Sequence, residues 1–186
     1  MHTAAPLAKP AARVILIETE RLQLAHLQPA DAGFIVELLN DPDWLRYIGD
    51  RGVRSEADAL AYIANGPGAM IARHGHGLYR VDRRSDGRAL GICGLLKRDS
   101  LPDIDLGYAF LPACRGQGYA LEAAQACLQE ARERLRVPRV LAITTPANAA
   151  SARVLLRLGM RLDRQQVLGG DTLDVYAIEF GSSGAA

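Results

Sequence analysis

The segment from Leu111 to Leu121, Leu-Pro-Ala-Cys-Arg-Gly-Gln-Gly-Tyr-Ala-Leu, constrains the fold of this chain more than any other. An alternating strand enters it from Ile104, and an amphipathic helix leaves it from about Tyr119. A strand that stops at a proline, crosses a short glycine loop and starts a helix exposes unpaired backbone N–H groups at the positive end of the helix dipole. The pattern therefore predicts an anion site, most often one for phosphate.

Spacing excludes two well-known phosphate loops. The loop of the nucleotide triphosphatases needs Lys and then Ser or Thr after its last glycine, but Gly118 is followed by Tyr119 and Ala120. The dinucleotide fingerprint needs a third glycine where Leu121 stands, and no following strand ends in the required acid. A different phosphate ligand is indicated.

The pattern that remains, Arg115-x-x-Gly118-x-Ala120, resembles the Arg/Gln-x-x-Gly-x-Gly/Ala motif of acetyltransferases of the GNAT superfamily. The resemblance implies that the loop holds the pyrophosphate of acetyl-CoA, mainly through its backbone, with Arg115 as a charged contact at the rim. Gly116 and Gly118 lack a Cβ, so the chain can approach a ligand closely. The alternative is a surface turn whose glycines only permit the bend. The coenzyme-binding residues implied here are Phe110, Leu111, Arg115, Gly116, Gln117, Gly118, Tyr119 and Ala120.

The strand before the loop alternates along its length, and Pro112 ends it because proline has no N–H to donate. One face carries Ile104, Leu106, Tyr108 and Phe110, and the other Asp105, Gly107, Ala109 and Leu111. In the GNAT superfamily this fourth strand splays from the next one. The resemblance implies that the pantetheine arm of acetyl-CoA pairs with strand groups exposed in the opening, at the stretch that Phe110 and Leu111 match.

A second motif, Asn-x-x-Ser-x-x-Val-Leu-x-x-Leu-Gly-Met from Asn148 to Met160, resembles the Rim-type branch, which modifies ribosomal-protein N-termini, and its small-molecule relatives. Glu18 to Leu22 and Asn40 to Ile48 resemble the same branch. The resemblance adds Asn148 and Ser151 to the implied coenzyme-binding residues. Asn148 is equally suited to cap a helix, with Gly159 placed to end it.

The resemblance implies that an amine attacks the thioester of acetyl-CoA directly. The amine must be neutral, although a lysine-type amine has a pKa of about 10.4 and an α-amino group about 8. Asp105 stands where relatives often carry Glu and is the candidate base, directly or through water. Its alternative is an ordinary polar strand residue, and Asp103 is a weaker substitute. A backbone N–H near Phe110 is implied to hold the negative charge that grows on the thioester oxygen.

Ser151 matches a hydroxyl that relatives are thought to use for protonating the departing thiolate. Many relatives use a Tyr four residues later, where this chain has Leu155. Because the Tyr is missing, Ser151 is the candidate acid for the thiolate. The missing Tyr also motivates an alternative, a module that binds acetyl-CoA as a sensor or partner without turnover.

The sequence says less about the amine that would accept the acetyl group. In relatives the helices between the first two strands wall the acceptor site, so Trp44 and Tyr47 are candidate substrate-binding residues, although helical spacing makes them equally good core residues. No acidic run selects polyamines, and no basic groove selects nucleic acid. A protein N-terminal α-amino group and a small-molecule amine both remain open, as do monomer and homodimer.

Composition bounds these expectations. The chain has 186 residues, 49% hydrophobic and 23% charged, with a net charge of +1, so no global field draws it to nucleic acid or membrane. Three cysteines are an odd number, which argues against a disulfide framework and for a reducing cytoplasm. His74 and His76 read as a loop and lack companions at metal-ligand spacing, so no metal is expected. No stretch approaches 18 apolar residues.

The expected fold is α/β: the GNAT acyl-CoA acyltransferase fold, with a mixed, mostly antiparallel sheet of about seven strands and helices on both faces. A mobile arm at residues 1–12, a single domain at 13–180 and a mobile tail at 181–186 are expected. The helices expected before the loop span Pro29–Leu39, Pro42–Ile48 and Ser55–Ala64. The strands expected elsewhere span Leu16–Leu27, Gly77–Asp82, Arg88–Lys97, Val137–Thr145, Met160–Leu168 and Thr172–Phe180.

Overall fold

The fold is built on one eight-stranded sheet in the order β1-β2-β3-β4-β5-β6-β8-β7. The structure, a computed structural model, describes residues 13–181, so the arm expected at 1–12 and nearly all of the expected tail lie outside the described residues. Every neighbouring pair of strands is antiparallel except β5 with β6. The α/β class and the mixed, mostly antiparallel sheet are confirmed, with one strand more than expected.

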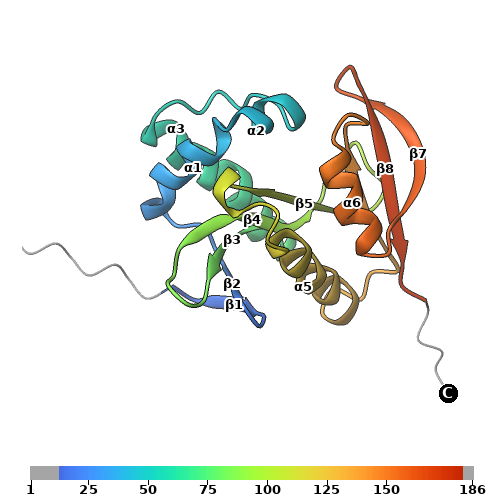
Figure 1. Ribbon diagram of the computed structural model, residues 1–186, viewed down its shortest axis with the longest axis horizontal. Helices are drawn as coiled ribbons and strands as arrows, with labels where there is room; N and C mark the ends of the chain where they lie inside the picture. Colours follow the sequence, from blue (N-terminus) through green and yellow to red (C-terminus); the bar gives the residue numbers. More distant parts are fainter. Residues whose placement is uncertain (1–12, 182–186) are drawn as a thin grey trace, which may run out of the picture.

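The elements follow the expected order along the chain (Figure 1). The strands are β1 Ile15–Glu18, β2 Leu22–Ala25, β3 Leu78–Arg83, β4 Ala89–Leu96, β5 Asp105–Phe110, β6 Arg139–Thr144, β7 Arg161–Leu168 and β8 Asp171–Glu179. The helices are α1 Ala32–Leu39, α2 Pro42–Tyr47, α3 Glu56–Ile63, α4 Ala69–His74, α5 Tyr119–Glu133 and α6 Ala149–Arg157. Three short helical turns are η1 Pro29–Asp31, η2 Ala64–Gly68 and η3 Pro112–Cys114.

The single first strand expected over Leu16–Leu27 is wrong, because the chain reverses within it. The Thr19 N–H donates to the Leu22 carbonyl at 3.0 Å, and the Leu22 N–H donates to the Thr19 hydroxyl at 3.0 Å. This turn separates β1 from β2, which pair antiparallel and account for the additional strand.

The loop expected around His74 and His76 is also partly wrong. Helix α3 runs on through η2 into α4, and His74 is the last residue of α4. The glycines and proline of η2 are turn signals in a sequence, so they conceal this helical continuation. His76 does lie in the connection that follows, but its ring is buried, with Nδ1 2.8 Å from the Leu95 carbonyl oxygen.

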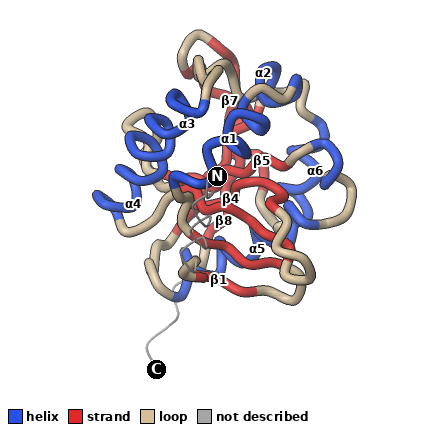
Figure 2. The backbone as a smooth tube through the Cα atoms, turned by 90° about the vertical axis from the view of Figure 1, so that its left-hand side faces the viewer, coloured by secondary structure: helices blue, strands red, loops and turns tan. Residues whose placement is uncertain are grey.

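Helices cover both faces of the sheet (Figures 1 and 2). Arg80 of β3 forms an ion pair with Asp31, which immediately precedes α1. This contact places α1 on one face of the sheet. The opposite face is covered by α5, since the sulfur of Cys93 on β4 lies 3.7 Å from that of Cys127 on α5. On β5 the two faces alternate, so Asp105 lies on the α1 side and Tyr108 on the α5 side.

The parallel pair β5 and β6 holds together at one point only. Asp105 is registered with Leu141, whose N–H donates to the Ile104 carbonyl at 2.9 Å. Beyond this point β5 continues along β4, whereas β6 continues along β8. The two strands therefore diverge, as the resemblance implied, and Figure 1 shows β5 crossing between the α1–α3 half and the β7–β8 half.

Gly94 on β4 packs so closely against the backbone of Gly77 that no side chain fits there. A Cβ at Gly94 would lie 1.9 Å from the Gly77 carbonyl oxygen, which no side-chain rotation relieves. We expect Gly94→Ala to lower the free energy of unfolding by about 1–3 kcal/mol or more. Gly33→Ala in α1 is the matched control, because its nearest atom is 3.7 Å away on a flexible Glu side chain. That change should be neutral or stabilise by up to about 1 kcal/mol. Urea unfolding measures the free energy of unfolding of both variants. If Gly94→Ala were as stable as Gly33→Ala, the close packing at Gly94 would be contradicted.

Candidate active site

The loop between η3 and α5 presents a row of free backbone donors. Gly116 and Gly118 have φ values of 73° and 80°, in the left-handed region that favours glycine. Among the described residues, no hydrogen bond uses the N–H groups from Gly116 to Ala120. These N–H groups lie at the start of the 15-residue helix α5, which is the arrangement that binds phosphates.

Arg115 ties this loop to α2. Its Nε donates to the Phe110 carbonyl at 2.9 Å, and its terminal nitrogens form ion pairs with Asp41 and Asp43 at the start of α2. The structure thus places the Arg115 side chain as a tether rather than as the expected charged contact at the rim. The exposed Gln117 side chain folds back onto the same loop, since its Nε2 donates to the Ala113 carbonyl at 3.0 Å.

Arg21 braces the other side of the loop, a role that the sequence did not indicate. Its Nε donates to Glu122 at 2.6 Å, a terminal nitrogen donates to the Gln117 carbonyl at 2.9 Å, and the guanidinium lies 4.7 Å from the centre of the Tyr119 ring. Burial alone would raise the pKa of Glu122, but hydrogen bonds from Thr19 and Arg21 outweigh it and hold this pKa below its ordinary value. Glu122 therefore stays ionised and keeps Arg21 in place.

The opening between β5 and β6 exposes further backbone groups. The Leu111 N–H donates to Leu90 on the β4 side, and the Ile104 carbonyl accepts from Leu141 on the β6 side. Because backbone groups alternate along a strand, the N–H groups of Tyr108 and Phe110 point to the β6 side. There the ladder has already ended, so both groups face the opening. This is where the resemblance implied a donor for the thioester oxygen.

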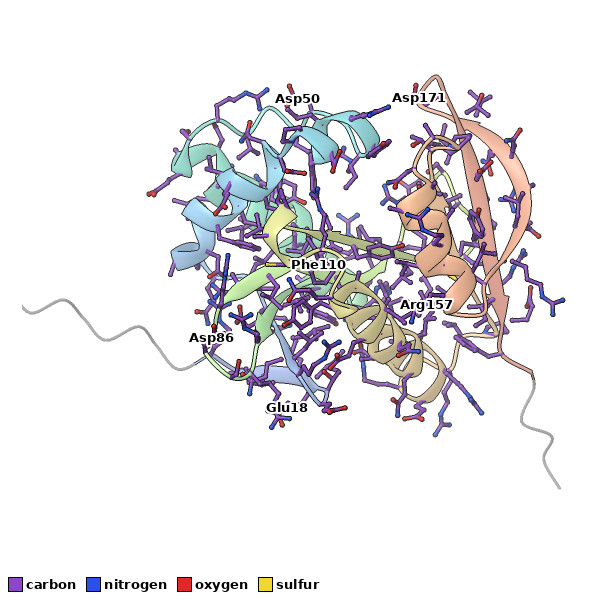
Figure 3. All side chains as sticks on the ribbon, in the orientation of Figure 1. Glu18, Asp50, Asp86, Phe110, Arg157 and Asp171 are labelled. Atoms are coloured by element: carbon purple, nitrogen blue, oxygen red, sulfur yellow. The ribbon has the colours of Figure 1, made fainter. Side chains whose placement is uncertain are left out.

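A cleft of about 1260 Å³ passes through this opening. It is lined by α2, η2, α4, β5, β6, α6 and the β7–β8 turn. Figure 3 marks its two sides: Asp171 at the β7–β8 turn lines it, and Asp50 follows directly on Gly49, which also lines it. The cleft brings together the four candidate acid–base and substrate-binding residues, Trp44, Tyr47, Asp105 and Ser151.

Asp105 is fully buried at the point where β5 and β6 diverge. The Nε of Arg98 lies 3.0 Å from each of its carboxylate oxygens. Burial raises the pKa of Asp105, and the positive charge of Arg98 only partly opposes this effect. Asp103 is 3.9 Å from Arg139 and does not line the cleft. Of the two acids considered, only Asp105 is placed to exchange a proton there.

Ser151 has a neighbour that sequence reasoning missed as a site residue. The Tyr108 hydroxyl lies 3.0 Å from the Ser151 Oγ and 3.2 Å from the Ser151 carbonyl oxygen. Burial raises the pKa of Tyr108 to about 12, so this phenol keeps its proton at neutral pH and is available as a donor. Asn148 caps α6 by accepting the Ser151 N–H at 3.1 Å, which confirms the capping expected of it.

The candidate substrate-binding residues differ in exposure. Trp44 is buried and belongs to the hydrophobic core, and its Nε1 donates to the Gly49 carbonyl at 3.1 Å. Tyr47 is half-buried, with the Arg46 guanidinium 5.0 Å from its ring centre. Thr145 also lines the cleft, and its hydroxyl is buried without a partner among the described residues. A free polar atom in this wall is suited to a ligand contact.

Within residues 13–181, no three His, Cys, Asp or Glu side chains are grouped closely enough to hold a metal ion. Across the same stretch, no helix is long and apolar enough to span a membrane. Cys93, Cys114 and Cys127 are buried free thiols.

Comparison with known proteins identifies the family. The model of the acetyltransferase (GNAT) domain matches residues 21–161. The uncharacterized N-acetyltransferase YnaD of Bacillus subtilis (strain 168) is 29% identical, with 78% of this chain and 82% of YnaD covered. An acetyltransferase from Agrobacterium tumefaciens str. C58 is 26% identical with a TM-score of 0.76, covering 96% of this chain and all of that one. Ribosomal-protein-S5-alanine acetyltransferase from Vibrio fischeri is 15% identical with a TM-score of 0.75, covering 91% and 98% of the two chains, and shares the fold. The chain belongs to the acetyltransferase (GNAT) family and is an acyltransferase with that family's α/β fold.

Proposed function

We propose that this enzyme transfers the acetyl group of acetyl-CoA to a primary amine, either a protein N-terminal α-amino group or a small-molecule amine, by direct attack. The observation that carries the proposal is the divergence of β5 and β6, which places free N–H groups, Asp105 and Ser151 around one opening. The loop with the second row of free N–H groups follows β5 after the short turn η3.

Acetyl-CoA has two sets of candidate partners, one in the loop before α5 and one at the end of β5. The free N–H groups from Gly116 to Ala120 are suited to its pyrophosphate, with Arg115 and Gln117 holding the loop in shape. The exposed N–H groups of Tyr108 and Phe110 are suited to the pantetheine arm and to the thioester oxygen, on which negative charge grows during attack. The side chains of Phe110 and Leu111 are buried in the core beside this stretch, so their contact with acetyl-CoA is proposed for the backbone, and Asn148 stands at the start of α6.

Asp105 is the proposed base, acting directly or through water. A base works best when its pKa lies near the working pH, and the raised pKa of Asp105 moves it in that direction. Trp44 and Tyr47 would contact the amine-bearing molecule from the α2 side of the cleft.

Ser151 is the proposed acid for the departing thiolate. When the Tyr108 phenol donates to the Ser151 Oγ, the Ser151 hydrogen is free to point elsewhere, including toward the thiolate. Tyr108 is then a positioning residue that acts through Ser151. The side chain of Asn148, which accepts the Ser151 N–H, and the rest of α6 hold Ser151 at the edge of the opening.

Three further assignments rest on the sequence. The Asn148–Met160 motif supports the Rim-type branch, the three free thiols support a reducing cytoplasm, and residues 13–180 are proposed as one domain. A non-catalytic acyl-CoA sensor is the alternative function, motivated by Leu155 in the place of the family Tyr.

The proposal is tested by measuring free thiol release from acetyl-CoA over a panel of amines, beside calorimetric binding of acetyl-CoA. We expect thiol release that depends on the amine. Tight coenzyme binding without thiol release for any amine would contradict the transferase and favour the sensor.

Asp105→Asn tests the base. At saturating acceptor, kcat should fall in the parent enzyme as pH falls through the pKa of Asp105, because the protonated acid cannot take a proton. The variant should lose this acidic limb and about 10²-fold or more of kcat. Asp103→Asn, the same change outside the cleft, is the control. A profile identical to the parent's would remove Asp105 from the mechanism.

Ser151→Ala, Tyr108→Phe and the double variant test the acid. Ser151→Ala should lower kcat by about 10- to 100-fold, near the low end of general acid catalysis because a thiolate leaves readily, with little change in the affinity for acetyl-CoA. Tyr108→Phe should lower kcat by less than Ser151→Ala does. The double variant should have the same kcat as Ser151→Ala, since Tyr108 acts through Ser151. If Tyr108→Phe costs more and Ser151→Ala leaves kcat unchanged, the phenol itself is the acid.

A further inference from the structure

The wall of the cleft carries an excess of positive charge. Its charged side chains are Arg46, Arg51, Arg73, Lys97 and Arg98, against Asp99, Asp105 and Asp171. Five cations therefore face three acids, in a protein whose overall charge is only +1. A cleft lined by one sign of charge concentrates ligands of the opposite sign.

Most of these cations have no acidic partner. Within the described part of the chain, Arg46, Arg51 and Arg73 form no ion pair. The Lys97 ammonium donates to two backbone carbonyls, at 3.3 and 2.9 Å, and not to a carboxylate. Arg98 donates to Asp105 through Nε, and within residues 13–181 its terminal nitrogens have no hydrogen-bond partner. The positive charge of the wall is thus available to a ligand.

One guanidinium group of the wall, that of Arg98, contacts the proposed base, and a second, that of Arg51, shares a neighbour with it. Arg98 touches Asp105, and the charges of Arg51 and Arg98 both act on the phenol of Tyr62 in the same wall. Burial raises the pKa of Tyr62, and these two charges oppose that rise. Arg51 and Arg98 therefore approach one wall of the cleft from different segments, one after α2 and one after β4.

These cations belong to the acceptor side of the site. The donor loop with its free N–H groups spans residues 116–120, and no residue from 111 to 120 lines the cleft. The phosphates of acetyl-CoA therefore have candidate partners elsewhere. The cationic wall is formed by α2, α4 and the segments after α2 and β4, none of which belongs to that loop.

We propose that the acceptor is a small amine that also carries a carboxylate or phosphate group, held by Arg51 and the free nitrogens of Arg98 while its amine faces Asp105. This inference rests on the proposed function. In the reaction the amine nitrogen bonds to the acetyl carbon, the C–S bond breaks, the amine loses a proton to Asp105 and the thiolate gains one. The anionic group is unchanged, and it supplies orientation through charge-assisted hydrogen bonds.

Matched pairs of acceptors test the inference by thiol release. The pairs are L-amino acids with their α-amides, and phosphoethanolamine with ethanolamine, so that carboxylate and phosphate are separate arms. Rates are expressed per neutral amine, because an amide lowers the pKa of the neighbouring amino group. We expect kcat/KM to be about 10- to 100-fold higher for the anionic member of at least one pair. Arg51→Gln should remove most of this preference, and Arg132→Gln, an exposed arginine on α5 outside the cleft, should keep it.

The outcomes separate this inference from the proposed function. If neutral members, or peptides with free N-termini, react as well as the anionic members, the inference is overturned while the transferase stands. If no amine releases thiol, the transferase fails, and calorimetry with the CoA-loaded protein still decides the inference. N-acetyl amino acids should then bind more tightly than N-acetyl amino acid amides, and less tightly to Arg51→Gln than to the parent. Equal binding of the acids and amides would overturn it.

Discussion

The single point of pairing between β5 and β6 is the constraint on which the rest of the site depends. Leu141 is fully buried there, packed with Leu101 and Val175, so the junction itself is firmly held. Past the junction each strand has a different antiparallel partner, and among the described residues the N–H groups of Tyr108 and Phe110 on the β6 side are left without one. An unpaired strand edge inside a protein is costly unless a ligand or water satisfies it. The divergence thus creates both a cavity and the donors that line it.

The opening joins the two faces of the sheet. Tyr108 lies with α5 and α6 on one face, and Asp105 lies on the face covered by α1, yet both line one cleft. In this geometry the proposed acid Ser151, which Tyr108 contacts, and the proposed base Asp105 reach one cleft from different faces of the sheet. The donor loop and the cationic wall come from different segments of the chain, since no residue from 111 to 120 lines the cleft, and Arg115 ties the loop to the start of α2.

Local signals in the sequence predicted a large part of this arrangement. The positive φ values of Gly116 and Gly118 and the capping by Asn148 follow from residues within one or two turns of each other, and so does the β7–β8 turn. The contacts that sequence reasoning missed are long-range. Arg115 reaches Asp41 across 74 positions and Arg21 reaches Glu122 across 101, and neither pair leaves a periodic pattern. The alternating pattern of the sequence predicts only a strand face for Tyr108, because its neighbour Ser151 is 43 positions away. The chemical roles of the site residues stay predictions.

Residue-resolved amide hydrogen exchange, with and without acetyl-CoA, tests the central claim most directly. We predict that the N–H groups of Tyr108 and Phe110 become protected when acetyl-CoA binds, because they face the opening. Those of Gly107 and Ala109, which face β4, should change little. Saturating binding of acetyl-CoA with no new protection at Tyr108 or Phe110 would contradict the claim that the donor occupies the opening between β5 and β6.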